Sequence, residues 1–291
     1  MKDRSLRKTD PPPAGKKGKA NRSLFQKLAA VPHTFWTMLF IAAPMLFVLY
    51  FAFTDGDGQF SLSNITGLGQ YTNVFILSIA FALIATVVCL IIGYPLAYFM
   101  SRQSPRAQKI LMVLIMLPMW CNLLIRTYAL MALLDNGGLL NSLLKNWGLP
   151  TIPIVGSYFG VILGMVYDFL PYMVLPIFTS MTKLDYRFIE ASHDLGCNSF
   201  QTMTKVVIPL TMSGVVSGVT MVFVPSISTF YISQKLGAGK IDLVGDTIER
   251  LFQNVSTYNV GAAMSLVMMI LIIISVTIMN KFSDEEGGIV P

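Results

Sequence analysis

Side chains that could catalyse a reaction or ligate a metal are scattered along the 291-residue chain. The candidates are His33, His193, Cys89, Cys121 and Cys197. None of them stands in a CxxC, HExxH or mixed Cys/His spacing, so we expect no metal site and reduced cysteines. The stretch 237–240 is faintly similar to a phosphate-binding loop, but Gln234 replaces the first glycine of GxxxxGK[ST] and Ile241 follows the lysine. The sequence therefore predicts that this chain is not an enzyme and binds no cofactor itself.

Two charged side chains, Arg126 and Asp168, each stand alone in a long apolar run. An ionisable group within a membrane is costly, so each would be a candidate functional residue if its run crosses a membrane. Composition decides whether these runs do so.

The composition is that of a membrane protein. Only 12% of the residues are charged and 54% are hydrophobic, and the mean hydropathy is +0.64. A soluble domain carries roughly 25% charged residues. These values exclude a soluble enzyme, a disordered protein and a fibrous protein, and they predict an integral membrane protein whose apolar surface contacts lipid. In this class the net charge of +6 indicates topology and not nucleic-acid binding.

Six charge-poor runs are each long enough for the ~20 helical residues that cross a bilayer. We place the spans near 34–53, 76–100, 110–132, 157–181, 208–232 and 260–280. The last run does not alternate between apolar and polar residues, which excludes a β-barrel. The predicted fold class is all-α, a polytopic membrane bundle of about six transmembrane helices. Gly214 and Gly218, four residues apart in the fifth span, predict a close helix–helix approach.

Lysine and arginine counts predict the orientation. With both termini cytoplasmic, the inside segments are the two tails and the loops 101–109 and 182–207. They hold 16 of the 21 Lys and Arg residues, which favours N-in and C-in. Residues 1–27 are basic and rich in Pro and Gly, and we expect a disordered cytoplasmic tail. Residues 28–281 form the predicted transmembrane domain, and 282–291 form a short cytoplasmic tail.

The cytoplasmic loop 182–209, between the fourth and fifth spans, has the pattern of a short helix. Thr182 and Asp185 resemble a capping box, and Gly196 suits the position that ends a helix. One apolar stripe recurs at spacings of four, three and four residues: Leu184, Phe188, Ala191 and Leu195. Acidic residues outnumber basic ones on the polar face. We therefore expect the stripe to dock into a groove of a soluble partner and not to lie on the membrane.

The same loop resembles a known motif. Glu190-Ala191-Ser192 is followed, after three residues, by Gly196 and, after nine more, by Val-Val-Ile-Pro at 206–209. This run is similar to the EAA loop, EAA-x3-G-x9-I-x-LP, of ABC importer permeases of the EAA-loop (type I) class. Ser, Val and Ile replace Ala, Ile and Leu, and every spacing is kept. Within that family the chain resembles the B-type permease subunits of spermidine/putrescine importers over residues ~34–281.

The resemblance implies a function and a set of partners. A permease of this family carries its cargo, here polyamines, into the cytoplasm by alternating access. It works with a second permease subunit (a paralogue), an ATPase dimer that binds ATP and Mg²⁺, and an extracytoplasmic substrate-binding protein. The implied location is the plasma (bacterial inner) membrane, with no nucleic acid as a partner. The ATPase-coupling residues implied by the motif and its helix are Asp185, Phe188, Glu190, Ala191, Ser192, Leu195, Gly196 and Pro209.

A polyamine cargo gives Asp168 a role, because carboxylates and aromatic faces bind ammonium groups. The expected substrate-pathway residues are Asp168, Trp120, Tyr128, Tyr167 and Tyr172. The alternative for Asp168 is an ion pair with Arg126 or the capping of a broken helix. Arg126 is predicted to be structural, since its charge would repel a cation.

Other functions fit the sequence less well. The cargo could be another small solute, such as ferric iron, phosphonate or thiosulfate. A secondary transporter or channel would leave the EAA-like pattern without a role. A membrane-embedded enzyme would need paired catalytic groups, and only Arg126 and Asp168 lie deep enough in the predicted spans.

Overall fold

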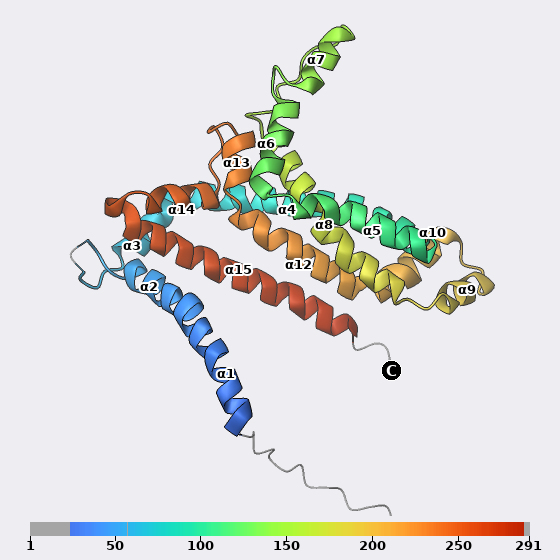
Figure 1. Ribbon diagram of the computed structural model, residues 1–291, viewed down its shortest axis with the longest axis horizontal. Helices are drawn as coiled ribbons and strands as arrows, with labels where there is room; N and C mark the ends of the chain where they lie inside the picture. Colours follow the sequence, from blue (N-terminus) through green and yellow to red (C-terminus); the bar gives the residue numbers. More distant parts are fainter. Residues whose placement is uncertain (1–23, 57, 288–291) are drawn as a thin grey trace, which may run out of the picture. The chain divides into compact units, whose positions relative to one another are not determined.

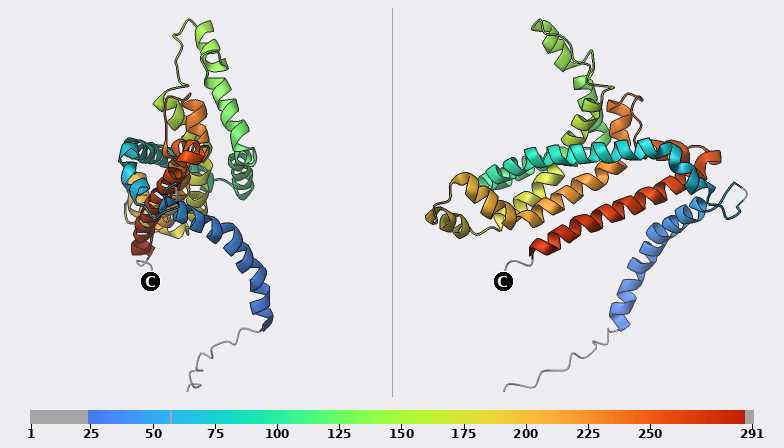
Figure 2. Two further views of the ribbon diagram at one scale, coloured as in Figure 1. Left: turned by 90° about the vertical axis from the view of Figure 1, so that its left-hand side faces the viewer. Right: turned by 180° about the vertical axis from the view of Figure 1, so that it is seen from behind.

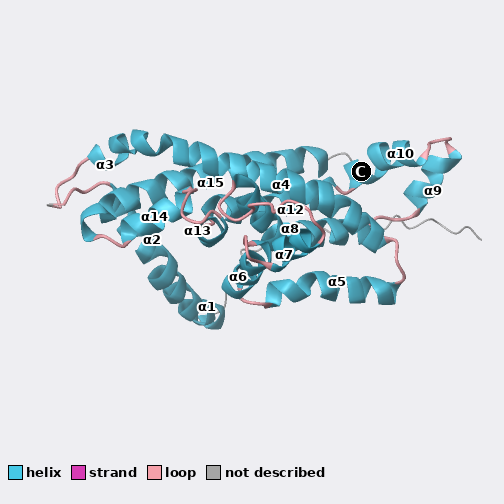
Figure 3. Ribbon diagram, turned by 90° about the horizontal axis from the view of Figure 1, so that it is seen from above, coloured by secondary structure: helices cyan, strands magenta, loops and turns pink. Residues whose placement is uncertain are grey.

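The computed structural model describes residues 24–56 and 58–287 (Figure 1). Helices and loops make up this part of the chain (Figure 3), and its only β pairing is an isolated bridge between Thr54 and Phe60. The chain divides into two units, residues 1–47 and 48–291. Residues 1–23 of the predicted N-terminal tail and 288–291 of the C-terminal tail lie outside the described residues.

The first predicted span is an interrupted helix. Helix α1, Leu24–Thr37, continues through a π-helical segment, Met38–Ala42, into α2, Ala43–Ala52. The stretch Val31–Ala52 is long and apolar enough to cross a membrane. Because α1 begins at Leu24, residues 24–27, which the sequence assigns to the tail, are helical.

The remaining helices follow one another with short connections. Their bounds are α3 Ser63–Thr66, α4 Thr72–Ser101, α5 Pro105–Trp120, α6 Leu123–Leu134, α7 Leu139–Asn146, α8 Tyr158–Thr182, α9 Arg187–Asp194, α10 Ser199–Thr202, α11 Ile208–Leu210, α12 Met212–Ser228, α13 Tyr231–Leu236, α14 Val244–Phe252 and α15 Tyr258–Gly287. Short 3-10 segments, Gly67–Tyr71 and Val255–Thr257, and a π-helical segment, Met203–Val207, complete the set. In the described residues, five helical stretches are long and apolar enough to span a membrane, or six if one bent pair counts as a span. The all-α polytopic fold is confirmed.

The third predicted span, 110–132, is wrong as a single helix. Helix α5 ends at Trp120, Cys121 is extended, and α6 begins at Leu123. The break has a local cause. Pro118 cannot donate a backbone hydrogen bond, and the Asn122 side chain accepts one from the Leu124 amide and so caps a new helix.

The fifth predicted span, 208–232, is also wrong as a single helix. The chain bends by 69° between the segment ending at Leu210 and α12. Thr211 lies at the bend, two residues after Pro209, and its hydroxyl donates a hydrogen bond to the Val207 carbonyl. Helix α12 then ends at Ser228, and α13 starts a separate short helix.

Helix α8 is the centre of the second unit. It packs on α4 and α12, and those two helices also contact each other (Figure 1). A Cβ placed on Gly214 would lie 2.5 Å from Ser180 Cβ, and one on Gly218 would lie 2.9 Å from Met173 Sδ. The predicted close approach at these two glycines is therefore confirmed, and α8 is the helix that they meet.

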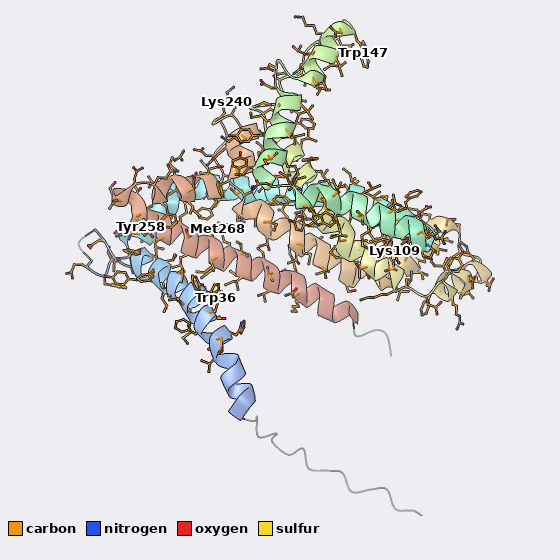
Figure 4. All side chains as sticks on the ribbon, in the orientation of Figure 1. Trp36, Lys109, Trp147, Lys240, Tyr258 and Met268 are labelled. Carbon is orange, nitrogen blue, oxygen red and sulfur yellow. The ribbon has the colours of Figure 1, made fainter. Side chains whose placement is uncertain are left out.

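The second unit has two distinct ends. Helices α9 and α10 lie at one end of the long helices, and α3 and α14 lie at the other (Figure 1). The two internal segments predicted to be cytoplasmic, 101–109 and 182–207, lie at the same end, where residues of both line one cavity. Helices α6 and α7 project away from the long helices (Figure 2), with the exposed Trp147 at the C-terminal end of α7 (Figure 4).

Candidate functional site

The predicted loop helix is present as α9. It begins after Asp185, whose Oδ1 accepts a hydrogen bond from the Arg187 amide at 3.0 Å. The predicted capping box with Thr182 is wrong. Helix α8 continues through Thr182, so the Thr182 hydroxyl donates back to the Thr179 carbonyl.

Helix α9 has an inner and an outer face. Ile189 and Ser192 are buried, whereas 53% of Phe188 and 85% of Leu195 are exposed. Ala191 and Glu190 are exposed as well. Large apolar side chains left open on one face of a short helix are typical of a docking surface. We call Phe188, Glu190, Ala191 and Leu195 the docking face.

Ser192 and Gly196 fix the shape of the loop. The Ser192 hydroxyl lies 2.9 Å from the Thr202 hydroxyl and donates to the Ile189 carbonyl, so it ties α9 to α10. Gly196 has φ +82°, the left-handed conformation predicted for it. The buried Ser192 therefore fixes the position of the docking face relative to α10. Pro209 is exposed and lies just before the bend into α12.

A cation–aromatic contact links α9 to α4. Arg102 follows α4, and its Cζ lies 4.9 Å from the Tyr98 ring centroid and 5.3 Å from the Tyr186 ring centroid. Tyr186 immediately precedes α9. A cavity of about 210 Å³ beside these residues is also lined by Ile189 of α9 and Val207. Arg102 was not among the predicted site residues. The available signals were Tyr98, shortly before Arg102, and Tyr186, directly before the loop helix.

Inside the bundle, Arg126 and Asp168 form an ion pair. Arg126 Nε lies 2.6 Å from Asp168 Oδ1, and the two side chains are 7% and 0% exposed. The Thr127 hydroxyl donates to Asp168 Oδ2 at 3.3 Å, and Arg126 Cζ lies 5.9 Å from the Tyr167 ring centroid. Of the arrangements considered for Asp168, the structure contains the ion pair with Arg126.

The other predicted pathway residues are spread over several places. Trp120 is exposed at the break between α5 and α6. Tyr172 lines a groove of about 510 Å³ between α8 and α12, together with Ser213, Gly214 and Ser217. Tyr128 of α6 lies beside α13. A role for any of them in transport stays a prediction.

Tyr128 belongs to a cluster that the sequence did not reveal. Its ring meets that of Tyr231 edge-on, with centroids 5.8 Å apart at 78°. Lys235 Nζ lies 5.1 Å from the Tyr128 centroid and 5.6 Å from the Tyr231 centroid. Tyr231 and Lys235 are four residues apart in α13, a spacing that places them on one helical face. That spacing was the available signal, but it did not indicate Tyr128 as the third member.

A buried carboxylate lies near this cluster in sequence. Asp246 in α14 is 4% exposed, and its Oδ2 accepts a hydrogen bond from the Leu243 amide at 2.8 Å. Burial raises the pKa of Asp246 to about 6, although the hydrogen bonds from Ser233 and Leu243 act in the opposite direction. Asp246 therefore binds a proton more readily than an exposed aspartate does.

The loop helix α9 and the bent segment that follows it lie within a region shared with a known protein family. The family described as the binding-protein-dependent transport system inner membrane component matches residues 91–286. The chain belongs to this family. The matched residues include α9, with its docking face, and most of the long helices, so the family assignment covers the features described above.

Relatives of this permease family match nearly the whole chain. The spermidine/putrescine transport system permease protein PotB of Haemophilus influenzae is 36% identical over 275 residues, 90% of this chain and 96% of the relative. PotB of Escherichia coli K12 is 37% identical over 245 residues, 81% of this chain and 89% of the relative. The inner membrane ABC transporter permease protein YdcU of the same organism is 27% identical and covers 79% and 78%.

The fold of this chain is similar to that of chains in solved structures. A chain of a bacterial alginate ABC transporter, in complex with an alginate pentasaccharide-bound periplasmic protein, superposes with a TM-score of 0.72. The two chains share 16% sequence identity, and the alignment covers 90% of this chain and 94% of the other. The fold of this chain is therefore similar to that of a chain in a bacterial ABC transporter.

Proposed function

We propose that this chain is one permease subunit of an ABC importer that carries polyamines, such as spermidine and putrescine, into the cytoplasm. The single observation that best supports the cargo is the 36% identity to a spermidine/putrescine permease over 90% of the chain. The docking face on α9 supports the transport mechanism. The proposed location is the bacterial inner membrane.

The importer contains partners that this chain does not supply. A second permease subunit completes the pathway, an ATPase dimer binds ATP and Mg²⁺, and an extracytoplasmic protein delivers the cargo. The docking face inserts into the ATPase, with Phe188 and Leu195 as apolar contacts and Glu190 as the charged one. Asp185, Ser192 and Gly196 hold the helix in shape.

The coupling step follows from rigid connections at both ends of α9. The Arg102 guanidinium contacts the rings of both Tyr98 and Tyr186 and so ties the start of α9 to α4. Ser192 ties the other side to α10, which leads into the bend before α12. When the ATPase dimer closes, a displacement of α9 is transmitted to α4 and α12, which both pack on α8. The bundle then switches between inward-open and outward-open states.

The test uses the complete importer, purified through a tag on this chain. Glu190→Lys reverses the charge of the docking face, and Asp135→Lys makes the same change at the exposed C-terminal cap of α6. We expect Glu190→Lys to lose the ATPase or to hydrolyse ATP without uptake of labelled spermidine, and Asp135→Lys to keep both. Normal assembly and normal uptake by Glu190→Lys would refute the docking face. Absence of spermidine uptake by the wild-type importer would refute the cargo.

A further inference from the structure

A cation already lies over two tyrosine rings in this structure. It is the ammonium of Lys235, which is 5.1 Å from the Tyr128 centroid and 5.6 Å from the Tyr231 centroid. The two rings come from helices more than 100 positions apart in sequence, α6 and α13, which pack on each other. An ammonium held over two ring faces is a built cation–π site.

The side chain in the site has the chemistry of the proposed cargo. A lysine side chain is an alkylammonium with a four-carbon stem. Putrescine is a four-carbon chain with an ammonium at each end, and spermidine carries one such aminobutyl end. The rings that hold Lys235 therefore offer the same contacts to an end of either polyamine.

The site lies where a ligand could enter it. Tyr128 is 47% exposed, so one ring is open to the surroundings. α13 follows the end of α12, and Lys235 lies in the segment between the fifth and sixth predicted spans, which the predicted N-in and C-in orientation places on the extracytoplasmic side. In the proposed importer this is the side on which cargo arrives.

We propose that Tyr128 and Tyr231 form a binding site for a primary ammonium of the cargo and that Lys235 occupies this site until the cargo displaces it. This inference rests on the proposed polyamine function. Lys235 then acts as an intramolecular competitor, which weakens the apparent affinity for cargo and keeps the empty site closed to other cations. Removing its charge should strengthen cargo binding, whereas removing a ring should weaken it.

The experiment measures the KM for spermidine uptake by the complete importer in proteoliposomes. Lys235→Gln removes the competing ammonium. Lys240→Gln removes a neighbouring exposed ammonium on the loop after α13 (Figure 4) and is the matched control. We expect Lys235→Gln to lower the KM about two- to fivefold, the range that one exposed cation–π contact supplies, and Lys240→Gln to leave it unchanged.

The tyrosines are tested by paired substitutions. Tyr128→Leu should raise the KM by a similar factor. Tyr128→Phe keeps the ring and should have the wild-type KM. An unchanged or raised KM in Lys235→Gln overturns the proposal, as does a Tyr128→Leu importer with the wild-type KM. If the wild-type importer takes up no spermidine, the proposed polyamine function is refuted. That result differs from a changed or unchanged KM in the variants, which tests the ammonium site alone.

Discussion

Arg126 and Asp168 form an ion pair between α6 and α8, with 2.6 Å between Nε and Oδ1. Both side chains are enclosed by protein, so neither is available to cargo in this conformation. A carboxylate and a guanidinium that neutralise each other can stay in the membrane interior at lower cost than either can alone. The pair therefore joins the outward-projecting α6 to the central helix of the bundle.

Breaking this pair should destabilise the permease. Asp168→Asn leaves the Arg126 charge buried without a carboxylate, and we expect a loss of about 3–5 kcal/mol in the free energy of unfolding. The double variant Arg126→Met, Asp168→Asn should recover a large part of that loss, because no unpaired charge remains. Denaturant unfolding of the purified protein measures both. If Asp168→Asn is as stable as the wild type but has a raised KM for cargo, Asp168 acts in the pathway and not in the fold.

Gly196 is the most sensitive backbone position of the docking loop. It has φ +82°, where a Cβ costs about 1–2 kcal/mol. We expect Gly196→Ala to shift α9 and lower uptake relative to ATP hydrolysis in the complete importer. Gly67→Ala is the control, since Gly67 has φ −69° and open space around an added Cβ. Equal ratios of uptake to hydrolysis in the two variants would mean that the turn at Gly196 does not position α9.

Arg102 should be needed for coupling although the docking face does not include it. Arg102→Gln removes the cation that contacts the rings of Tyr98 and Tyr186, so α9 loses its connection to α4. We expect the importer to assemble but to hydrolyse more ATP for each spermidine taken up. Arg106→Gln, in the same segment between α4 and α6, should have the wild-type ratio. A wild-type ratio for Arg102→Gln as well would contradict the transmission route through α4.

Asp246 should make the stability of the permease depend on pH. Its folded-state pKa is raised to about 6, whereas an unfolded aspartate titrates near 4. The protonated form is therefore favoured by folding. This contribution to stability is fully present below pH ~4 and is lost as the pH rises through 6.

Asp246→Asn tests this dependence, because the amide oxygen can still accept the hydrogen bond from Leu243. We expect the variant to be more stable than the wild type by about 2–3 kcal/mol at pH 7.5, a shift of two pKa units, and equal to it near pH 4. Denaturant unfolding between pH 4 and 8 measures the difference. Asp135→Asn is the control, since Asp135 is exposed at the C-terminal cap of α6. A constant difference across the pH range would contradict the burial of a titrating carboxylate.

The parts of the fold that the sequence predicted are those that hydropathy controls. The spans at 76–100, 157–181 and 260–280 agree with α4, α8 and α15, because apolar length alone decides whether a helix crosses a membrane. The breaks at Cys121 and Thr211 were not predicted. Proline and a polar side chain stand at both, but prolines also lie inside the unbroken α4 and α8, so residue type alone does not decide where a helix breaks.

In the candidate site, too, the local features were predictable from the sequence and the long-range contacts were not. Gly196 and the exposed Phe188 and Leu195 were predictable, since they depend on local spacing. The contacts of Lys235 with Tyr128 and of Arg102 with Tyr186 were not, because each joins segments far apart in the chain. Tertiary packing decides such pairs, and a single sequence holds no record of it.

The central position of α8 has a consequence for how the protein is made. The ribosome delivers α4 and Arg126 before α8, but α12 and α13 after it. Asp168 can be neutralised as soon as α8 enters the membrane, because Arg126 is already there. Gly164, which in the finished protein lies against Ile232 and Leu236, has no such neighbour until those residues are synthesised. In the order of synthesis, the charge of Asp168 on α8 can therefore be neutralised before Gly164 on the same helix gains its packing partners.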